Sequence, residues 1–347
     1  MTRLKHKRMK RFKVKDNIIN IILKVIPILL IVWFIWAQYG LLINKNFIYS
    51  TSDLPKSFTG YKIVHISDIC NTSINIESKV KKQNPDIIVV SGGYSDKNGD
   101  YSKSVKIVNK LTQIAPVYYI YNSEDTIDIL ASTNATNITD MTVQLSPKQQ
   151  DVKTFIENNY GKAIIDKYNK GDSEAVDYIN YVTEELSNTS NSTIDLCGLG
   201  LYNYDNGIYD AKNKTYELIG TDATRLSILL NGNINNLDEI CKTDVDVIMF
   251  GGTFGTELIS LDYTKGLYGN HGTSLFVSGG VGNHLGITRL LNFPEIQTIT
   301  LSDGTITDKN PLEDFIGIFL KDVGTIFDND GGFSSYKRSY ENGEIKN

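Results

Sequence analysis

The sequence predicts an α/β domain that follows one apolar helix near the N-terminus. Two observations carry this prediction. A basic N-terminal segment precedes an apolar run that is long enough to cross a bilayer as a helix, for which roughly 20 residues suffice. Beyond residue 60, short apolar runs of strand length alternate with segments of helical spacing. This alternation is typical of parallel βαβ units, so we expect a sheet-based domain covered by helices.

The N-terminal residues predict a membrane anchor. Residues 1–17 hold eight Lys or Arg side chains and one acid, Asp16. Residues 18–43 are almost entirely apolar, with Lys24 near the basic end and aromatic residues such as Trp33 beyond the middle, as suits a membrane interface. We expect an uncleaved transmembrane helix, because the run is longer than a signal-peptide core and lacks a small-residue cleavage site. A cleaved signal peptide is the alternative.

Charge predicts the topology and limits the partners. An excess of Lys and Arg before the helix places the N-terminus in the cytoplasm and the main domain outside the cell membrane. The chain carries −5 overall, and residues 1–24 hold nine bases and one acid, so the remainder carries −13. An acidic domain is a poor partner for nucleic acid. We therefore expect a single-pass protein that contacts membrane lipid through its N-terminal helix and binds no nucleic acid.

Cysteine usage excludes a disulfide-stabilised scaffold. The chain has three cysteines, Cys70, Cys197 and Cys241, too few for a disulfide framework in a chain of 347 residues. Cys197 lies in an apolar strand-like run and Cys241 in a helix-like segment, so we expect both to be buried free thiols. The sequence does not choose a pair that could form a single bridge.

The main domain is predicted to span residues 50–321. Its strand-like runs are 61–68, 86–93, 116–122, 192–205, 224–232, 244–252, 274–282 and 295–301, and its helix-like segments are 76–85, 102–114, 146–169, 173–188 and 235–243. The pattern loosens over about 127–192, where we expect a helical insertion that begins with a polar loop over 131–142. Residues 322–347 are polar and are predicted to be disordered. In parallel sheets, functional loops gather at the carboxyl ends of the strands.

Six segments in this order resemble the membrane-anchored branch of the calcineurin-like metallophosphoesterases. They are LPKSFTGYKIVHISDIC, NPDIIVVSGGYSD, IAPVYYIYNSED, SILLNGN, VDVIMFGGTFGTE and GNHGTSLFVSGGVGNHLGITRLLNFPEIQTITL. Together they cover residues 54–125 and 194–302. The resemblance implies a four-layer sandwich, in which two mixed β-sheets pack together with helices on both outer faces. It also implies a site where two divalent cations hold a phosphate ester and activate water.

The residues at the family's ligand positions argue against that chemistry. Two positions keep the family's ligand types, Asp68 and Asn122. At the other ligand positions the family's residue is replaced. Gly93 stands in place of the metal-bridging Asp, Ser123 in place of the His that acts as an acid, and Gly232 in place of the next strand's His. Gly252 and Phe254 stand in place of the final His pair. Cys70 replaces another His. Glycine has no side chain to coordinate a metal, so we expect no metal cofactor and no hydrolysis by the family mechanism.

Other roles for these residues remain open. Asp68 could cap the following turn through backbone N–H groups. A rebuilt site could join Asp68 to His65, Cys70, His271 and His284, which would suit one divalent ion such as Zn, Mn or Fe. Glycines are expected in tight turns where loops crowd together: Gly92, Gly93, Gly251, Gly252, Gly279, Gly280 and Gly282.

Three functions follow from these observations. The first is a catalytically inactive, membrane-anchored protein of this fold that binds a ligand or an envelope protein. The second is a phosphoester hydrolase with a rebuilt or reduced metal site. The third is a structural domain of the cell envelope. The missing ligands favour the first.

Overall fold

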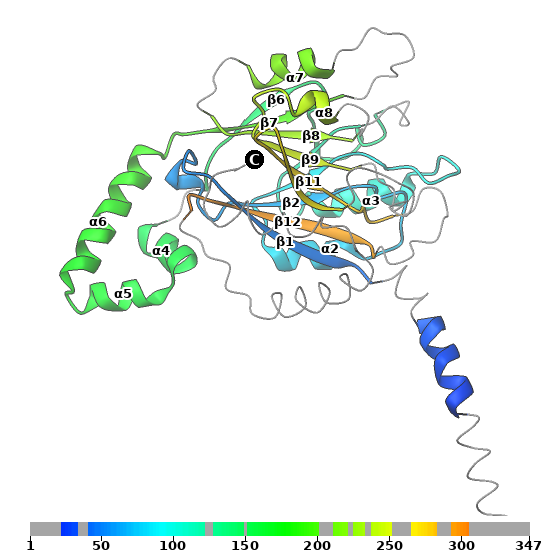
Figure 1. Ribbon diagram of the computed structural model, residues 1–347, viewed down its shortest axis with the longest axis horizontal. Coiled ribbons are helices and arrows are strands. Elements are labelled where there is room, and N and C mark those ends of the chain that lie inside the picture. Colours follow the sequence, from blue (N-terminus) through cyan, green and yellow to red (C-terminus); the bar gives the residue numbers. More distant parts are fainter. Residues whose placement is uncertain are drawn as a thin grey trace, which may run out of the picture.

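The chain folds into two packed six-stranded sheets with helices on their outer faces (Figure 1). The computed structural model describes residues 22–33, 41–121, 128–148, 151–200, 211–220, 225–232, 237–251, 265–282 and 293–304. The two mixed sheets flanked by helices confirm the predicted α/β architecture.

The first sheet has four parallel strands at one side and a reversed pair at the other. Its order is β1 (Ile43–Ser50), β12 (Glu295–Ser302), β2 (Lys62–Ile66), β3 (Ile87–Val90), β4 (Val117–Tyr119) and β5 (Thr136–Asn137). Strands β2 to β5 are parallel, β12 is antiparallel to β2, and β1 is parallel to β12. A short 3-10 helix, η1 (Lys56–Phe58), leads from β1 into β2.

The second sheet is also mixed. Its order is β10 (Gly266–Asn270), β11 (Thr273–Val277), β9 (Val247–Phe250), β8 (Ser227–Asn231), β7 (Ile194–Gly198) and β6 (Thr142–Leu145). The four central strands are parallel, and β10 and β6 are the antiparallel edges. At one side the two sheets come together, because Asp140 N, between β5 and β6, donates to Gly198 O at 2.8 Å.

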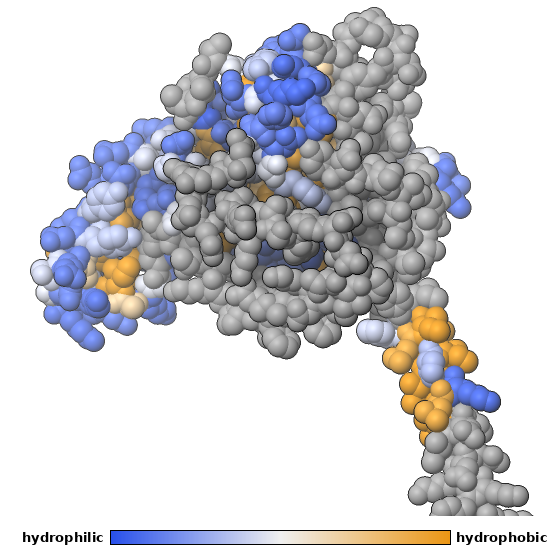
Figure 2. Space-filling model, in the orientation of Figure 1, coloured by the Kyte–Doolittle hydropathy of each residue, from blue (hydrophilic) through white to orange (hydrophobic). Residues whose placement is uncertain are grey.

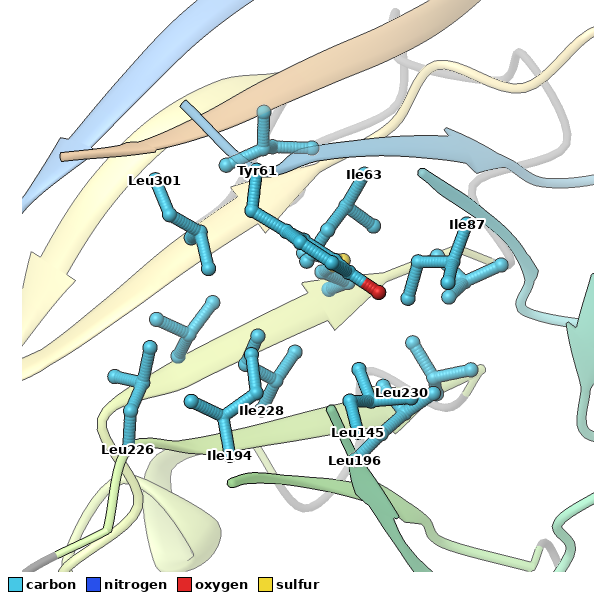
Figure 3. Close-up of a cluster of buried hydrophobic side chains, with 14 of the residues drawn as sticks. Tyr61, Ile63, Ile87, Leu145, Ile194, Leu196, Leu226, Ile228, Leu230 and Leu301 are labelled. Atoms are coloured by element: carbon cyan, nitrogen blue, oxygen red, sulfur yellow. The ribbon is translucent and has the colours of Figure 1, made fainter. Parts of the chain in front are cut away.

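A layer of aliphatic side chains fills the space between the sheets. Ile63 and Ile87 of the first sheet lie opposite Ile228 and Leu230 of the second (Figure 3). These strands are short continuous apolar runs because both faces of each sheet are covered. The inner face therefore supplies one core and the two outer faces supply two more.

Helices cover the outer faces. On the first sheet these are α2 (Ile76–Gln83) and α3 (Ser102–Leu111), and on the second α7 (Ala211–Ile219) and α8 (Leu237–Ile240). Helix α2 begins where Asn75 accepts a hydrogen bond from Ser78 N at 3.2 Å and ends at Asn84 in the left-handed region. Pro85 directly follows Asn84 and cannot continue the helix.

Three further helices form an arm beyond one end of the sheets (Figure 1). They are α4 (Val152–Tyr160), α5 (Lys162–Asn169) and α6 (Ser173–Asn188), with a small core of their own. The arm is part of the predicted insertion. The predicted loop at 131–142 instead contains β5 and the start of β6, so the insertion also adds an edge strand to each sheet. Strand β1 likewise begins before the predicted domain start at residue 50.

The predicted membrane segment is described only in part. Residues 22–33 form a helix with exposed apolar side chains (Figure 2). Within the described residues, no helix is long and apolar enough to cross a membrane. The predicted span 18–43 also includes 18–21 and 34–40, which lie outside the described residues. Leu41 and Leu42 are not helical, and Ile43 already belongs to β1. The predicted tail at 322–347 also lies outside them.

Candidate functional site

The carboxyl ends of strands from both sheets meet at one edge. Ser67, one residue after β2, donates through its hydroxyl to Ser278 Oγ, one residue after β11, at 2.8 Å. Val281 N donates to Ser67 O at 3.0 Å, and Gly282 N donates to Asp68 O at 2.6 Å. Segments from both sheets therefore approach one another here, as the rule for parallel sheets predicts.

Asp68 lies at the centre of this edge and has no solvent exposure. Its φ is 49°, in the left-handed region that Asp tolerates better than most residues. Its backbone N–H donates to Gly92 O at 3.0 Å, and its Oδ2 lies 3.3 Å from Ser67 Oγ. The backbone of Asp68 is thus part of the link between β2 and β3.

Two glycines close over the Asp68 carboxylate. Gly93 has a φ of +71°, and a Cβ placed on it would lie 2.5 Å from Asp68 Oδ1 and 2.6 Å from Asp68 Cα. Gly280 has a φ of +70°, and its Cβ would lie 2.7 Å from both Asp68 Cβ and Oδ2. Real Cβ atoms do not approach other atoms this closely, so no side chain fits at position 93 without a shift of the backbone. The metal-bridging carboxylate that the resemblance implies at this position has no room here.

Two more glycines bring neighbouring segments into contact. A Cβ on Gly251, which follows β9, would lie 2.5 Å from Ser67 Cβ. A Cβ on Gly282 would lie 2.6 Å from Cys70 Cβ. These positions confirm the prediction that glycines occur where loops crowd together.

A chain of buried hydrogen bonds runs along the same edge between the sheets. His65 Nδ1 lies 3.2 Å from Gln297 Oε1, and His65 Nε2 lies 2.7 Å from Ser91 Oγ. The amide nitrogen of Gln297 donates to Val277 O at 2.7 Å and to Glu295 Oε1 at 3.2 Å. Because the Gln297 amide oxygen must then accept, Nδ1 of His65 carries the proton and Nε2 accepts from the Ser91 hydroxyl.

The environment of His65 keeps its ring neutral. His65 has no solvent exposure, and burial lowers its pKa to about 4, although the hydrogen bond to Gln297 opposes that shift. A Ser beside a neutral His resembles an activated nucleophile. Ser91, however, is fully buried, and Gly251 packs against its hydroxyl. The pair therefore joins the strands and is closed to a substrate.

The structure brings together only part of the predicted rebuilt metal site. Cys70 follows Asp68 and is buried, but both ring nitrogens of His65 already have partners. His271 lies in the turn before β11, at the opposite end of that strand from Ser278. His271 therefore does not join Asp68. The sequence already shows this, because His271 precedes the strand-like run at 274–282.

Several predicted positions fall elsewhere. Asn122, Ser123, Gly252, Phe254 and His284 lie outside the described residues. Gly232 directly follows β8 at the same edge. Among the residues that the structure describes, no group of three His, Cys, Asp or Glu side chains could hold a metal ion.

The three cysteines and two buried polar side chains complete the comparison with the sequence. Cys197 and Cys241 are buried free thiols, as the sequence predicts, and Cys70 is also buried and forms no disulfide. Burial raises the pKa of Cys197 to about 11 and that of Cys241 to about 12, so both stay thiols at neutral pH. Ser91 and Gln297 were not singled out from the sequence. Ser91 follows a continuously apolar strand, whereas Gln297 is one of several polar residues in β12 and nothing local distinguishes it.

Comparisons with known proteins do not identify a family for this chain. No family model matches the sequence, and no curated protein matches it. A crystal structure of TT1561 from Thermus thermophilus is similar over 64% of this chain and 90% of its own, with 11% sequence identity and a TM-score of 0.36. A similarity at this level carries no argument about family or function.

Proposed function

We propose that this chain is a membrane-anchored, catalytically inactive protein of the metallophosphoesterase fold that acts by binding a partner at the cell envelope. The proposal rests first on the closure of Gly93 over Asp68. The family needs a carboxylate at position 93 to hold two cations close against their mutual repulsion. Here that position has neither a side chain nor space for one. The residues present do not fit a dinuclear metal site.

The family assignment is supported by where the resembling segments lie. The first two contain Asp68 and Gly93, two and three residues after β2 and β3, and two later ones contain Gly251 and Gly280, after β9 and β11. All four positions meet at one edge between two mixed sheets. Order, spacing and placement in space therefore agree with the resemblance.

The arm is the surface that we propose for the partner. It lies outside the four layers and is attached near η1, where Ser57 N donates to Thr189 Oγ1 at 3.1 Å and Ser57 Oγ donates to Thr189 O at 2.7 Å. Helix α5 has no buried side chain, and Tyr181 on α6 is 54% exposed. Aromatic side chains in such positions are common anchors of protein interfaces. A structural domain of the envelope is the alternative role for the same arm.

The decisive measurement is the metal content of the full chain in mild detergent. The protein is incubated with Mn²⁺, Zn²⁺ and Fe²⁺, dialysed and analysed for bound metal beside an Asp68→Ala control. We expect no metal above the control and no turnover of a phosphodiester. About one metal per chain that is lost in Asp68→Ala would support the reduced-site hydrolase instead. Two metals per chain would refute the proposal.

A further inference from the structure

The direction of β1 determines which edge of the domain lies nearest the anchor. Strand β1 is parallel to β12, and β12 is antiparallel to β2. Because β2, β3 and β4 are parallel, β1 runs opposite to all three. Its first residue, Ile43, therefore lies at the edge where those strands end. This is the edge that holds Asp68.

Hydrogen bonds link the start of β1 to the candidate site in two steps. Ile43 N donates to Pro294 O at 2.8 Å, and Ile43 is the register partner of Glu295. Glu295 N then donates to Gly280 O at 3.0 Å, and Gly280 packs on the Asp68 side chain. The chain thus enters the domain one strand away from the site.

The connection to the anchor is short. The last described residue of the apolar helix is Trp33, and Leu41 is the first described residue of the domain. Eight residue steps span at most about 28 Å even when fully extended. The edge that contains Ile43 must therefore stay close to the membrane surface.

The opposite edge carries the arm. Ser57 and Gly60 precede β2, and they contact Thr189 and Asn159 of the arm. Lys148, just before the arm, forms an ion pair at 3.3 Å with Asp86, which precedes β3. The arm is therefore attached where the parallel strands begin, and Figure 1 shows it beyond that end of the sheets.

We infer that the carboxyl-end edge of the sheets faces the membrane and contacts a phospholipid headgroup surface, while the arm points away from it. This inference rests on the proposed anchor. The loop after β3 supports it, because Tyr101 is 40% exposed there and Lys97 and Lys103 are exposed beside it. Tyrosine rings and lysine side chains are both suited to the headgroup region.

Charge limits which lipids are suitable. The part of the chain after residue 24 carries −13, so an anionic surface repels the domain as a whole. The contact should therefore be closer on zwitterionic vesicles than on strongly anionic ones. The short tether holds the orientation in either case.

The test compares two labelled positions in the full chain. Asn98→Cys places a fluorophore in the loop after β3, and Lys170→Cys places one between α5 and α6; both positions are exposed, and the native cysteines are buried. Each variant is reconstituted into zwitterionic vesicles that carry a quencher on the lipid headgroup. The eight-residue strand β1 alone separates the two edges by roughly 26 Å. We expect strong quenching at position 98 and little at position 170.

The outcomes separate the orientation from the anchor. Equal quenching at both positions, or stronger quenching at position 170, would overturn the orientation in a protein that still floats with the vesicles. A chain that does not float with vesicles would overturn the anchor and this inference with it. A Tyr101→Ser variant should lower the quenching at position 98 without releasing the chain from the vesicles.

Discussion

Stability should fall in mild acid because His65 is buried in its neutral form. The ring has no solvent exposure and lies between Ser91 Oγ and Gln297 Oε1, with Glu295 beyond the Gln297 amide. The contact with Ser91 requires the neutral ring, because Nε2 accepts the Ser91 hydroxyl, whereas Nδ1 donates to Gln297 in either state. Protonation of His65 would place an uncompensated charge in the core.

The size of the effect follows from the two pKa values of His65. Its pKa is 6.5 in an unfolded chain and about 4 in the folded protein. The unfolded state therefore binds more protons as the pH falls below about 6.5, and the folded state follows only below pH 4. The free energy of unfolding should drop by about 2 kcal/mol between pH 7.5 and pH 5, and by about 3 kcal/mol in total at lower pH.

Pulse proteolysis of the full chain in urea and mild detergent measures this change. The matched control is His65→Gln, which keeps hydrogen-bonding groups at the site but does not titrate. The wild type should lose about 2 kcal/mol more than the control between the two pH values. If both proteins lose the same amount, His65 does not carry the charge effect and the assignment of its neutral state is wrong.

Two further predictions concern the glycines and the arm. Gly93→Ala should lower the free energy of unfolding by about 2–4 kcal/mol, because the strain of a left-handed φ and a steric clash add. Gly99→Ala should lower it by only about 1 kcal/mol, since a Cβ there meets nothing within 4 Å. Equal losses of the two variants in urea unfolding would contradict the close packing of Gly93 on Asp68. Replacing 146–193 with Asn-Gly should leave both sheets folded, because Leu145 and Ile194 are register partners in an antiparallel pair. Far-UV circular dichroism should then show lost helix, and an envelope partner cross-linked by the full chain should no longer be captured.

The central strands were predictable because each is buried on both faces. A run such as Ile87–Val90 is continuously apolar, and that pattern needs no knowledge of its neighbours. The edge strands were missed for the opposite reason. Strand β1 contains Asn44, Lys45 and Asn46 and is only half-buried, and β5 has two residues. Their positions depend on pairing with strands far away in the sequence.

The candidate site could be predicted only where a single residue type indicates the local structure by itself. Glycine at a strand end predicts crowding, and Gly93 and Gly280 fulfil that prediction. The link between His65 and Gln297 joins residues 232 positions apart through the register of β2 and β12. Nothing local to either residue indicates that register. His271 differs, because it precedes the apolar run 274–282 in the sequence and its place at the amino end of β11 could have been predicted.

The closed edge is a set of mutually dependent positions. A carboxylate introduced at position 93 alone would meet the Asp68 carboxylate, and moving Asp68 away would bring it against Gly280. Separating the strands would break the bond between Ser67 and Ser278 and expose the buried His65 contacts. Each glycine thus makes the others necessary. A carboxylate introduced at position 93 would therefore destabilise this edge, and this is why we propose that the protein acts through its surfaces.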